Sequence, residues 1–199
     1  MKSDSVAFGV AGILFGLIAG WVIGSQQAAL RQPAAAVQAA QATGSTAAIL
    51  DQAQVNAFMT VAEREPSNAT PRVQLGNLYF DAERYDDAIK WYSDALRLSP
   101  NQVEISTDLG VSYYYTNQPD KALEQFDKSL KLDPKHTKTL LNVGIVKAFG
   151  KQDLQGAQQA WEQVITLAPQ SPEAQAARRA LDSLRAAHPN PGAAQKPGA

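Results

Sequence analysis

Apolar residues follow two different patterns along this chain of 199 residues. Residues 6–24 form an apolar run without a charge, whereas residues 47–187 place apolar side chains three or four positions apart, the spacing of amphipathic helices. Residues 25–46 are mostly Ala, Gln, Ser, Thr and Gly, and residues 188–199 are rich in Pro, Gly and Ala. We therefore expect a leader (1–5), a membrane segment, a linker, a helical domain and a disordered tail.

The run 6–24 predicts a single transmembrane helix, because nineteen helical residues span about 30 Å, the thickness of the hydrocarbon core. A cleaved signal peptide is the alternative, but its apolar core is usually only about 7–15 residues long and ends at a small-x-small site. Four glycines recur every fourth residue and would line one helix face, which favours helix–helix packing and a homo-oligomer. These glycines are Gly12, Gly16, Gly20 and Gly24.

Residues 47–187 contain a unit of thirty-four residues that recurs along the chain. An aliphatic residue followed by glycine marks each unit, an aromatic residue lies sixteen or seventeen positions after that glycine, and a proline closes the unit. The pairs are Leu75-Gly76, Leu109-Gly110 and Val143-Gly144; the aromatics are Tyr92, Phe126 and Trp161; the prolines are Pro100, Pro134 and Pro169. The predicted boundaries are a half repeat at 47–68, repeats at 69–102, 103–136 and 137–171, and a cap helix at 172–187.

Each unit predicts two amphipathic helices, with small residues where the paired helices approach and a large aromatic filling the gap toward the next unit. A unit this small cannot cover its own apolar face, so neighbouring units must stack. Thr70-Pro71 and Ser171-Pro172 predict helix starts with a capping hydroxyl before proline. The cap helix carries Ala177, Leu181 and Leu184 on one side and charged residues on the other.

These motifs closely resemble the tetratricopeptide-repeat (TPR) family over about residues 48–187: LGNLYF…DDAIKWYSDALRLSP, LGVSYYY…DKALEQFDKSLKLDP and VGIVKAF…QGAQQAWEQVITLAP. The resemblance implies an all-α fold, a right-handed α-solenoid of helix pairs, here with an N-terminal transmembrane helix and a C-terminal capping helix. The third unit departs from the pattern. Lys147 stands where the first two units have tyrosine, and one extra residue enters the turn near residues 151–153.

The resemblance also implies that the first helices of successive units line a concave groove for a protein or peptide client. The expected groove residues are Val73, Asn77, Phe80, Thr107, Val111, Tyr114, Tyr115, Leu141, Ile145 and Phe149. Tyr79 and Tyr113 are expected in the core. TPR domains that capture the acidic carboxyl terminus of heat-shock chaperones use Lys, Asn, Asn, Lys and Arg in this groove. The corresponding residues here are Val73, Asn77, Asp108, Lys138 and Asn142, which argues against that function.

Composition points away from catalysis and from nucleic acid. The chain has no cysteine and two histidines distant in sequence, so neither thiol chemistry nor a metal cage is expected, and we predict no catalytic residue, metal or cofactor. A formal net charge of −1 gives no general attraction to nucleic acid. We also expect no small-molecule substrate.

The sequence thus predicts a membrane-anchored adaptor that binds protein clients. Lys2 in the short leader favours an inside amino terminus, which would place the repeats in the periplasm, anchored to a bacterial inner membrane; the cytoplasmic orientation stays open. Two other functions stay open. The carboxyl end resembles TPR proteins of cytochrome c maturation that hold apocytochrome, and the glycine face together with uneven charge is compatible with a self-assembling scaffold.

Overall fold

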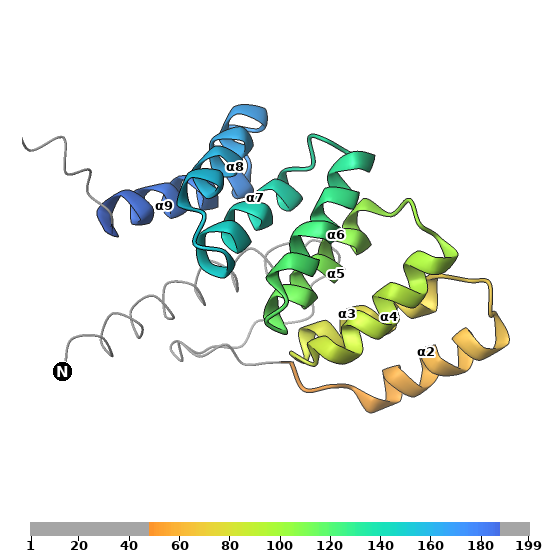
Figure 1. Cartoon of the computed structure of the whole chain (residues 1–199). Helices are drawn as coiled ribbons and strands as arrows, with labels where there is room; N and C mark the ends of the chain where they lie inside the picture. Colours follow the sequence, from red (N-terminus) through yellow and green to blue (C-terminus); the bar gives the residue numbers. More distant parts are fainter. Residues whose placement is uncertain (1–47, 188–199) are drawn as a thin grey trace, which may run out of the picture. The chain divides into compact units, whose positions relative to one another are not determined.

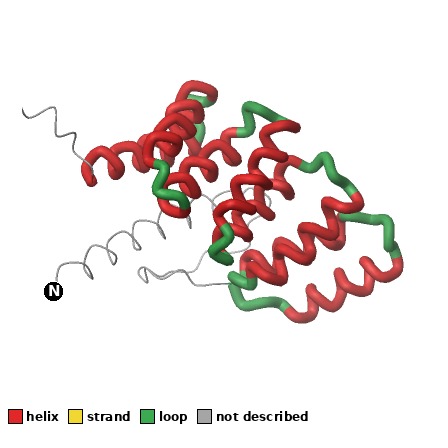
Figure 2. Tube along the Cα trace, viewed as in Figure 1, coloured by secondary structure: helices red, strands yellow, loops and turns green. Residues whose placement is uncertain are grey.

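The computed structural model describes residues 48–187, and every regular element in that range is a helix (Figure 1, Figure 2). In chain order they are α2 (Gln52–Arg64), α3 (Thr70–Asp81), α4 (Tyr85–Leu98), α5 (Val103–Tyr115), α6 (Pro119–Leu132), α7 (Thr137–Ile145), the π-helical turn η2 (Val146–Gly150), α8 (Leu154–Leu167) and α9 (Pro172–Ala187). This confirms the all-helical prediction for the described residues.

The described residues do not include the two ends of the chain, 1–47 and 188–199. The leader, the transmembrane helix 6–24 with its four glycines, the linker and the tail all lie outside the described residues. Among the helices of 48–187, none has both the length and the apolar character needed to cross a bilayer.

The helices of residues 48–187 pack in the order of the chain. Each one contacts the next, from α2 through α9, and α7 also contacts α5 and α9 (Figure 1). Such nearest-neighbour packing is the hallmark of stacked helical repeats. At the end of the stack, Ala177 and Leu181 of α9 are buried while Arg178 and Asp182 are exposed, as expected of a helix that covers the last repeat.

In each repeat the glycine of the first helix lies against the aromatic ring of the second helix. The pairs are Gly76 with Tyr92, Gly110 with Phe126, and Gly144 with Trp161. A Cβ at any of these glycines would overlap ring atoms, so the recurring glycine is what allows the paired helices to approach. Each ring thus packs on the glycine of its own repeat, a contact in addition to the predicted filling of the gap toward the next unit.

The extra residue of the third repeat is accommodated inside a helix rather than in a loop. The Lys151 N–H donates to the Val146 carbonyl (3.0 Å), an i to i+5 bond that widens the end of the first helix into the turn η2. Lys147, which replaces the tyrosine of the other repeats, pairs with Asp153 (3.4 Å). Asp153 in turn accepts a hydrogen bond from Gly156 N–H (2.8 Å) and so caps α8.

One of the two predicted helix caps is correct. The Ser171 hydroxyl accepts a hydrogen bond from Ala174 N–H (3.1 Å) at the start of α9. Thr70 does not cap α3, because the helix starts after Ala69 without a side-chain cap. The Asn68 side chain accepts from Thr70 N–H instead (2.9 Å), so an Asn two residues upstream satisfies this backbone group.

Candidate functional site

Four aromatic rings from the first two repeats form a continuous row where α3, α4 and α5 meet. Tyr85 and Tyr115 stack at 4.4 Å between centroids, and Phe80 meets both rings edge-on at 5.4 and 6.4 Å. Tyr114 continues the row at 6.0 Å from Tyr115. We call these four rings the aromatic row. Phe80 is its buried base, while the three tyrosines are half-buried.

The aromatic row leads toward the third repeat. The Tyr114 ring lies against Gly150, 3.2 Å from the position that a Cβ on this glycine would occupy. Phe149, the preceding residue on η2, keeps 48% of its surface exposed, the second largest exposure among the large apolar residues of the described helices and their loops. The row thus reaches the residue that follows Phe149, and an exposed aromatic side chain at such a place is the kind of surface that protein partners cover.

The tyrosines of the row are neutral at physiological pH, as tyrosine is at its ordinary pKa of 10. Burial moves the pKa further from neutrality: it raises the pKa of Tyr85 and Tyr114 to about 12, and it also raises the pKa of Tyr115. Their hydroxyls therefore remain hydrogen-bond donors and acceptors at physiological pH. Ring contacts of this kind contribute about 0.5–1.5 kcal/mol per pair beyond the buried area, so they hold the row in place before any partner arrives.

The structure separates the ten predicted groove residues into two groups. Half-buried or exposed residues are available to a partner: Val73, Asn77, Tyr114, Tyr115 and Phe149. The other five are buried and form packing between helices: Phe80, Thr107, Val111, Leu141 and Ile145. Those five side chains therefore offer little surface to a partner. Tyr79 and Tyr113, expected in the core, are only half-buried, with Arg84 over the first ring at 5.0 Å and Lys121 over the second at 5.5 Å.

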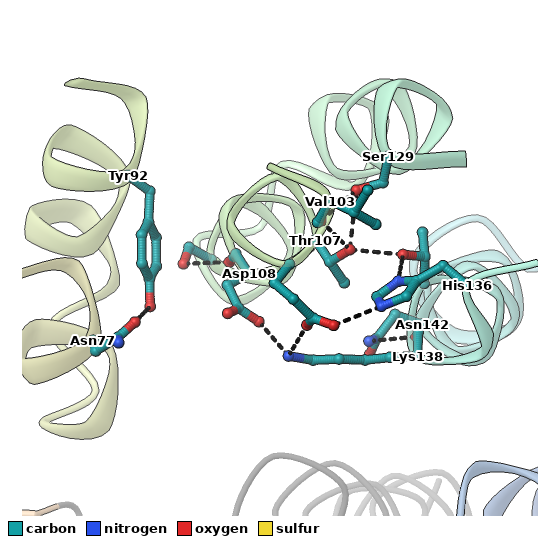
Figure 3. A network of polar contacts seen from close by, with 12 residues as sticks. Asn77, Tyr92, Val103, Thr107, Asp108, Ser129, His136, Lys138 and Asn142 are labelled. Atoms are coloured by element: carbon teal, nitrogen blue, oxygen red, sulfur yellow. Dashed lines mark hydrogen bonds and ion pairs between the residues drawn. The ribbon is translucent and has the colours of Figure 1, made fainter. Parts of the chain in front are cut away.

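Thr107 is fully buried, and its hydroxyl joins three helices (Figure 3). It donates to the Val103 carbonyl (2.9 Å) of its own helix α5. It also meets the hydroxyls of Ser129 on α6 (3.0 Å) and Thr139 on α7 (2.6 Å). Sequence reasoning missed this network, because the spacing of Thr107 and Thr139 by nearly one repeat is its only signal.

A cluster of charged residues connects α5 with the start of α7 (Figure 3). Lys138 pairs with Asp108 (2.8 Å) and Glu104 (3.2 Å), and its side chain is only 14% exposed. His136 bridges Glu104 (2.7 Å) and Thr139 (2.6 Å). The hydrogen bond from His136, followed by the charge of Lys138, lowers the pKa of Glu104 to about 2, while burial raises the pKa of Asp108. The charge of Lys138 is thus neutralised within the protein.

The cluster includes two of the five positions, Asp108 and Lys138, that the resemblance assigns to binding an acidic carboxyl terminus. Lys138, one of only two matching residues, is already held by Glu104 and Asp108. Asn77, the other, accepts a hydrogen bond from the Tyr92 hydroxyl (2.8 Å; Figure 3). A carboxylate ligand here would meet two protein carboxylates, which is electrostatically unfavourable. Within residues 48–187 no group of His, Asp or Glu is arranged to hold a metal ion.

Comparison with protein families identifies the repeats directly. The family model described as TPR repeat matches residues 76–117, and the model described as tetratricopeptide repeat matches residues 103–136. These matches include the Leu109-Gly110 pair and the whole of α5 and α6. No curated protein sequence matches the chain.

Solved structures with the same fold include three that illustrate its range. The first TPR of Spaghetti (RPAP3), solved with the HSP90 peptide SRMEEVD, is 25% identical over 60% of this chain and 91% of its own, with a TM-score of 0.54. The Sgt2 TPR domain from Aspergillus fumigatus is 24% identical over 66% and 85%, with a TM-score of 0.56. MamA 41-end from Desulfovibrio magneticus RS-1 is 21% identical over 61% and 68%, also with a TM-score of 0.56.

Proposed function

This chain is a tetratricopeptide-repeat protein, and we propose that it is an adaptor that binds a segment of a client protein along the aromatic row toward Phe149, while residues 6–24 anchor it to a membrane. One observation supports the proposal: the rings of two repeats extend to Gly150 of the third, the residue that follows the exposed Phe149. A bound segment would cover this apolar surface, and aromatic residues of this kind supply most of the binding energy in protein interfaces.

The family supports a protein-binding role. Tetratricopeptide repeats are interaction modules, and the similar RPAP3 domain was solved with a peptide bound. The neutral tyrosine hydroxyls of the row add hydrogen-bonding groups beside apolar ring faces, a combination that suits an extended or helical peptide. The two clusters described above, the hydroxyl network and the charged cluster, then act as the rigid support that fixes α5 against α6 and α7.

The test of this role is site-specific photo-crosslinking of the full chain in cells. A photo-reactive phenylalanine analogue replaces Phe149 in one variant and Leu132, on α6, in the control; Leu132 is 42% exposed and therefore similarly accessible. We expect a discrete crosslinked client at position 149 that is lost when Tyr114 and Tyr115 are replaced by alanine. Equal crosslinking at both positions, or crosslinks that survive the tyrosine substitutions, would refute binding along the row.

The proposed membrane anchor and orientation need a separate test. The natural chain has no cysteine, so Ser183→Cys on the exposed side of α9 provides a single labelling site. We propose a bacterial inner-membrane protein with its repeats in the periplasm. A membrane-impermeant maleimide should then label intact cells whose outer membrane has been permeabilised. Protection until the inner membrane is lysed would place the repeats in the cytoplasm, and recovery of the chain without membranes would remove the anchor.

A further inference from the structure

The first helix of each repeat carries an aromatic residue three positions before a residue in the left-handed backbone conformation. The left-handed residues are Glu83, Asn117 and Gln152. The aromatics that precede them are Phe80, Tyr114 and Phe149. Counted from the glycine of the helix pair, the aromatic comes four positions later in the first two repeats and five positions later in the third. The extra residue of the third repeat therefore stands between Gly144 and the ring of Phe149.

Ala148 occupies the place that the aromatics have in the first two repeats. It lies four positions after Gly144 and is only 5% exposed, whereas Phe149 is 48% exposed. Phe80, at the same place in the first repeat, is 7% exposed. The turn η2 contains the extra residue, because its i to i+5 hydrogen bond encloses one residue more than an α-helical bond. A small side chain thus fills the buried place, and the ring moves one position outward.

The third repeat has apolar residues that could receive a ring at the buried place. In the first repeat three rings surround Phe80: Tyr85 at 5.4 Å, Tyr115 at 6.4 Å and Tyr92 at 6.5 Å. The corresponding helices α8 and α9 carry apolar residues at the same distances from their starts: Leu154, Trp161 and Leu184. The exposure of Phe149 therefore results from its position along the turn, and not from a shortage of apolar surface around it.

The turn η2 is held close to the second repeat. It contacts α6 as well as α7 and α8, and the Lys151 ammonium at its end pairs with Asp120 at the start of α6 (2.6 Å). A Cβ on Gly150 would lie 2.9 Å from the Pro119 Cβ and 3.2 Å from the Tyr114 ring, so the missing side chain allows this approach. The turn thereby brings the residue before Gly150 next to the end of the aromatic row.

We propose that the extra residue of the third repeat is a positioning device: the π turn that contains it keeps Phe149 out of the buried place and presents the ring to the client. Ala148, which fills that place, is the positioning residue. The inference rests on the proposed function and explains how one of its binding residues is set. Of the three aromatics at this point of the repeats, Phe149 alone is exposed, and π turns within α-helices are frequent at functional sites.

Deletion of Ala148 tests the proposal, because it gives the third repeat the spacing of the first two. The experiment compares the natural chain, the deletion, Phe149→Ala, and the deletion combined with Phe149→Ala, each as the full chain in non-ionic detergent. A fluorophenylalanine in place of Phe149 reports the accessibility of the ring, through the broadening of its fluorine NMR line by a soluble gadolinium chelate. The same label at Phe80 is the buried reference. Client affinity is measured with the segment that crosslinks at position 149.

In the natural chain the label at Phe149 should broaden more than the label at Phe80, and in the deletion both should broaden alike. We expect the deletion to weaken client binding as much as Phe149→Ala, at least about tenfold, and to add less than about twofold in the Phe149→Ala background. A ring that stays exposed, or an equal loss with and without Phe149, would overturn the inference, while client binding by the natural chain would keep the adaptor function. If no client crosslinks at position 149 of the natural chain, the proposed function fails and the inference fails with it.

A second variant moves the ring without a deletion. Ala148→Phe with Phe149→Ala exchanges the two side chains, so the length and the composition of the chain stay the same. Circular dichroism verifies the fold of each variant, and the exchange decides the question if the deletion does not fold. We expect the exchange to bind the client as weakly as Phe149→Ala does. Binding with the affinity of the natural chain would show that the position of the ring along the turn does not matter, and would overturn the inference.

Discussion

Replacing Gly144 with alanine tests how the paired helices of the third repeat meet. An added Cβ would lie 2.6 Å from Cε2 of the Trp161 indole, so the ring has to move. This ring is only 1% exposed, and its Nε1 donates a 3.1 Å hydrogen bond to the Leu141 carbonyl. Movement of the ring therefore disturbs both the packing and a buried hydrogen bond.

The expected magnitude follows from three opposing contributions. Overpacking of a filled core destabilises by about 1–3 kcal/mol, and weakening the indole hydrogen bond adds about 1 kcal/mol. Alanine in place of glycine within a helix stabilises by about 1 kcal/mol, which offsets the second contribution. We expect Gly144→Ala to lower the free energy of unfolding by about 2 kcal/mol, measured by urea titration with circular dichroism.

The same substitution in a Trp161→Leu variant separates the effect of packing against the indole from the effect of helix propensity. In Trp161→Leu the smaller side chain leaves room for the new Cβ, so Gly144→Ala should there be neutral or stabilise by up to about 1 kcal/mol. If the alanine lowers stability equally with and without the indole, contact with Trp161 is not the cause. If it stabilises the natural chain, the close approach itself is refuted.

Three further predictions concern the charged and polar groups. Glu104 has a folded pKa of about 2, below its ordinary value of 4.5, so its stabilising effect is present above pH 4.5 and is lost as the pH falls toward 2. The carboxylate is 58% exposed, so we expect Glu104→Gln to lower the free energy of unfolding by only about 1 kcal/mol at neutral pH. In acid titrations this difference between the natural chain and the variant should vanish between pH 4.5 and 2. Glu83→Gly should raise the free energy of unfolding by about 0.5 kcal/mol, measured by urea titration, since glycine adopts the left-handed backbone conformation without strain. Thr107→Val should lower stability by about 1 kcal/mol, because the hydroxyls of Ser129 and Thr139 each lose one of their two partners; a change below about 0.5 kcal/mol would show that the Thr107 hydroxyl is not stabilising.

The repeat made the helices predictable. Glycine recurs where a ring must pack, and apolar residues recur every three or four positions, so the class of the fold was evident from residues 69–136 alone. The extra residue of the third repeat was also visible, but not its position, because a π turn and a longer loop contain the same number of residues. Which of the two forms depends on contacts of Lys147 and Asp153 that the sequence does not reveal.

The candidate site was less predictable than the fold. Family resemblance specifies which helix face a residue occupies, but burial depends on what packs against it. Thr107 and Leu141 share the expected face with Tyr115, yet neighbouring helices cover them.

The most direct test of the account measures the affinity of a client segment for the full chain and for two matched variants. Phe149→Ala removes the exposed ring at the end of the row, and Leu132→Ala removes a similarly exposed apolar side chain from α6. The segment is the one crosslinked at position 149. We predict that Phe149→Ala weakens binding at least about tenfold, as for a residue central to an interface, while Leu132→Ala has no measurable effect. Equal affinities for the natural chain and Phe149→Ala would contradict binding along the aromatic row.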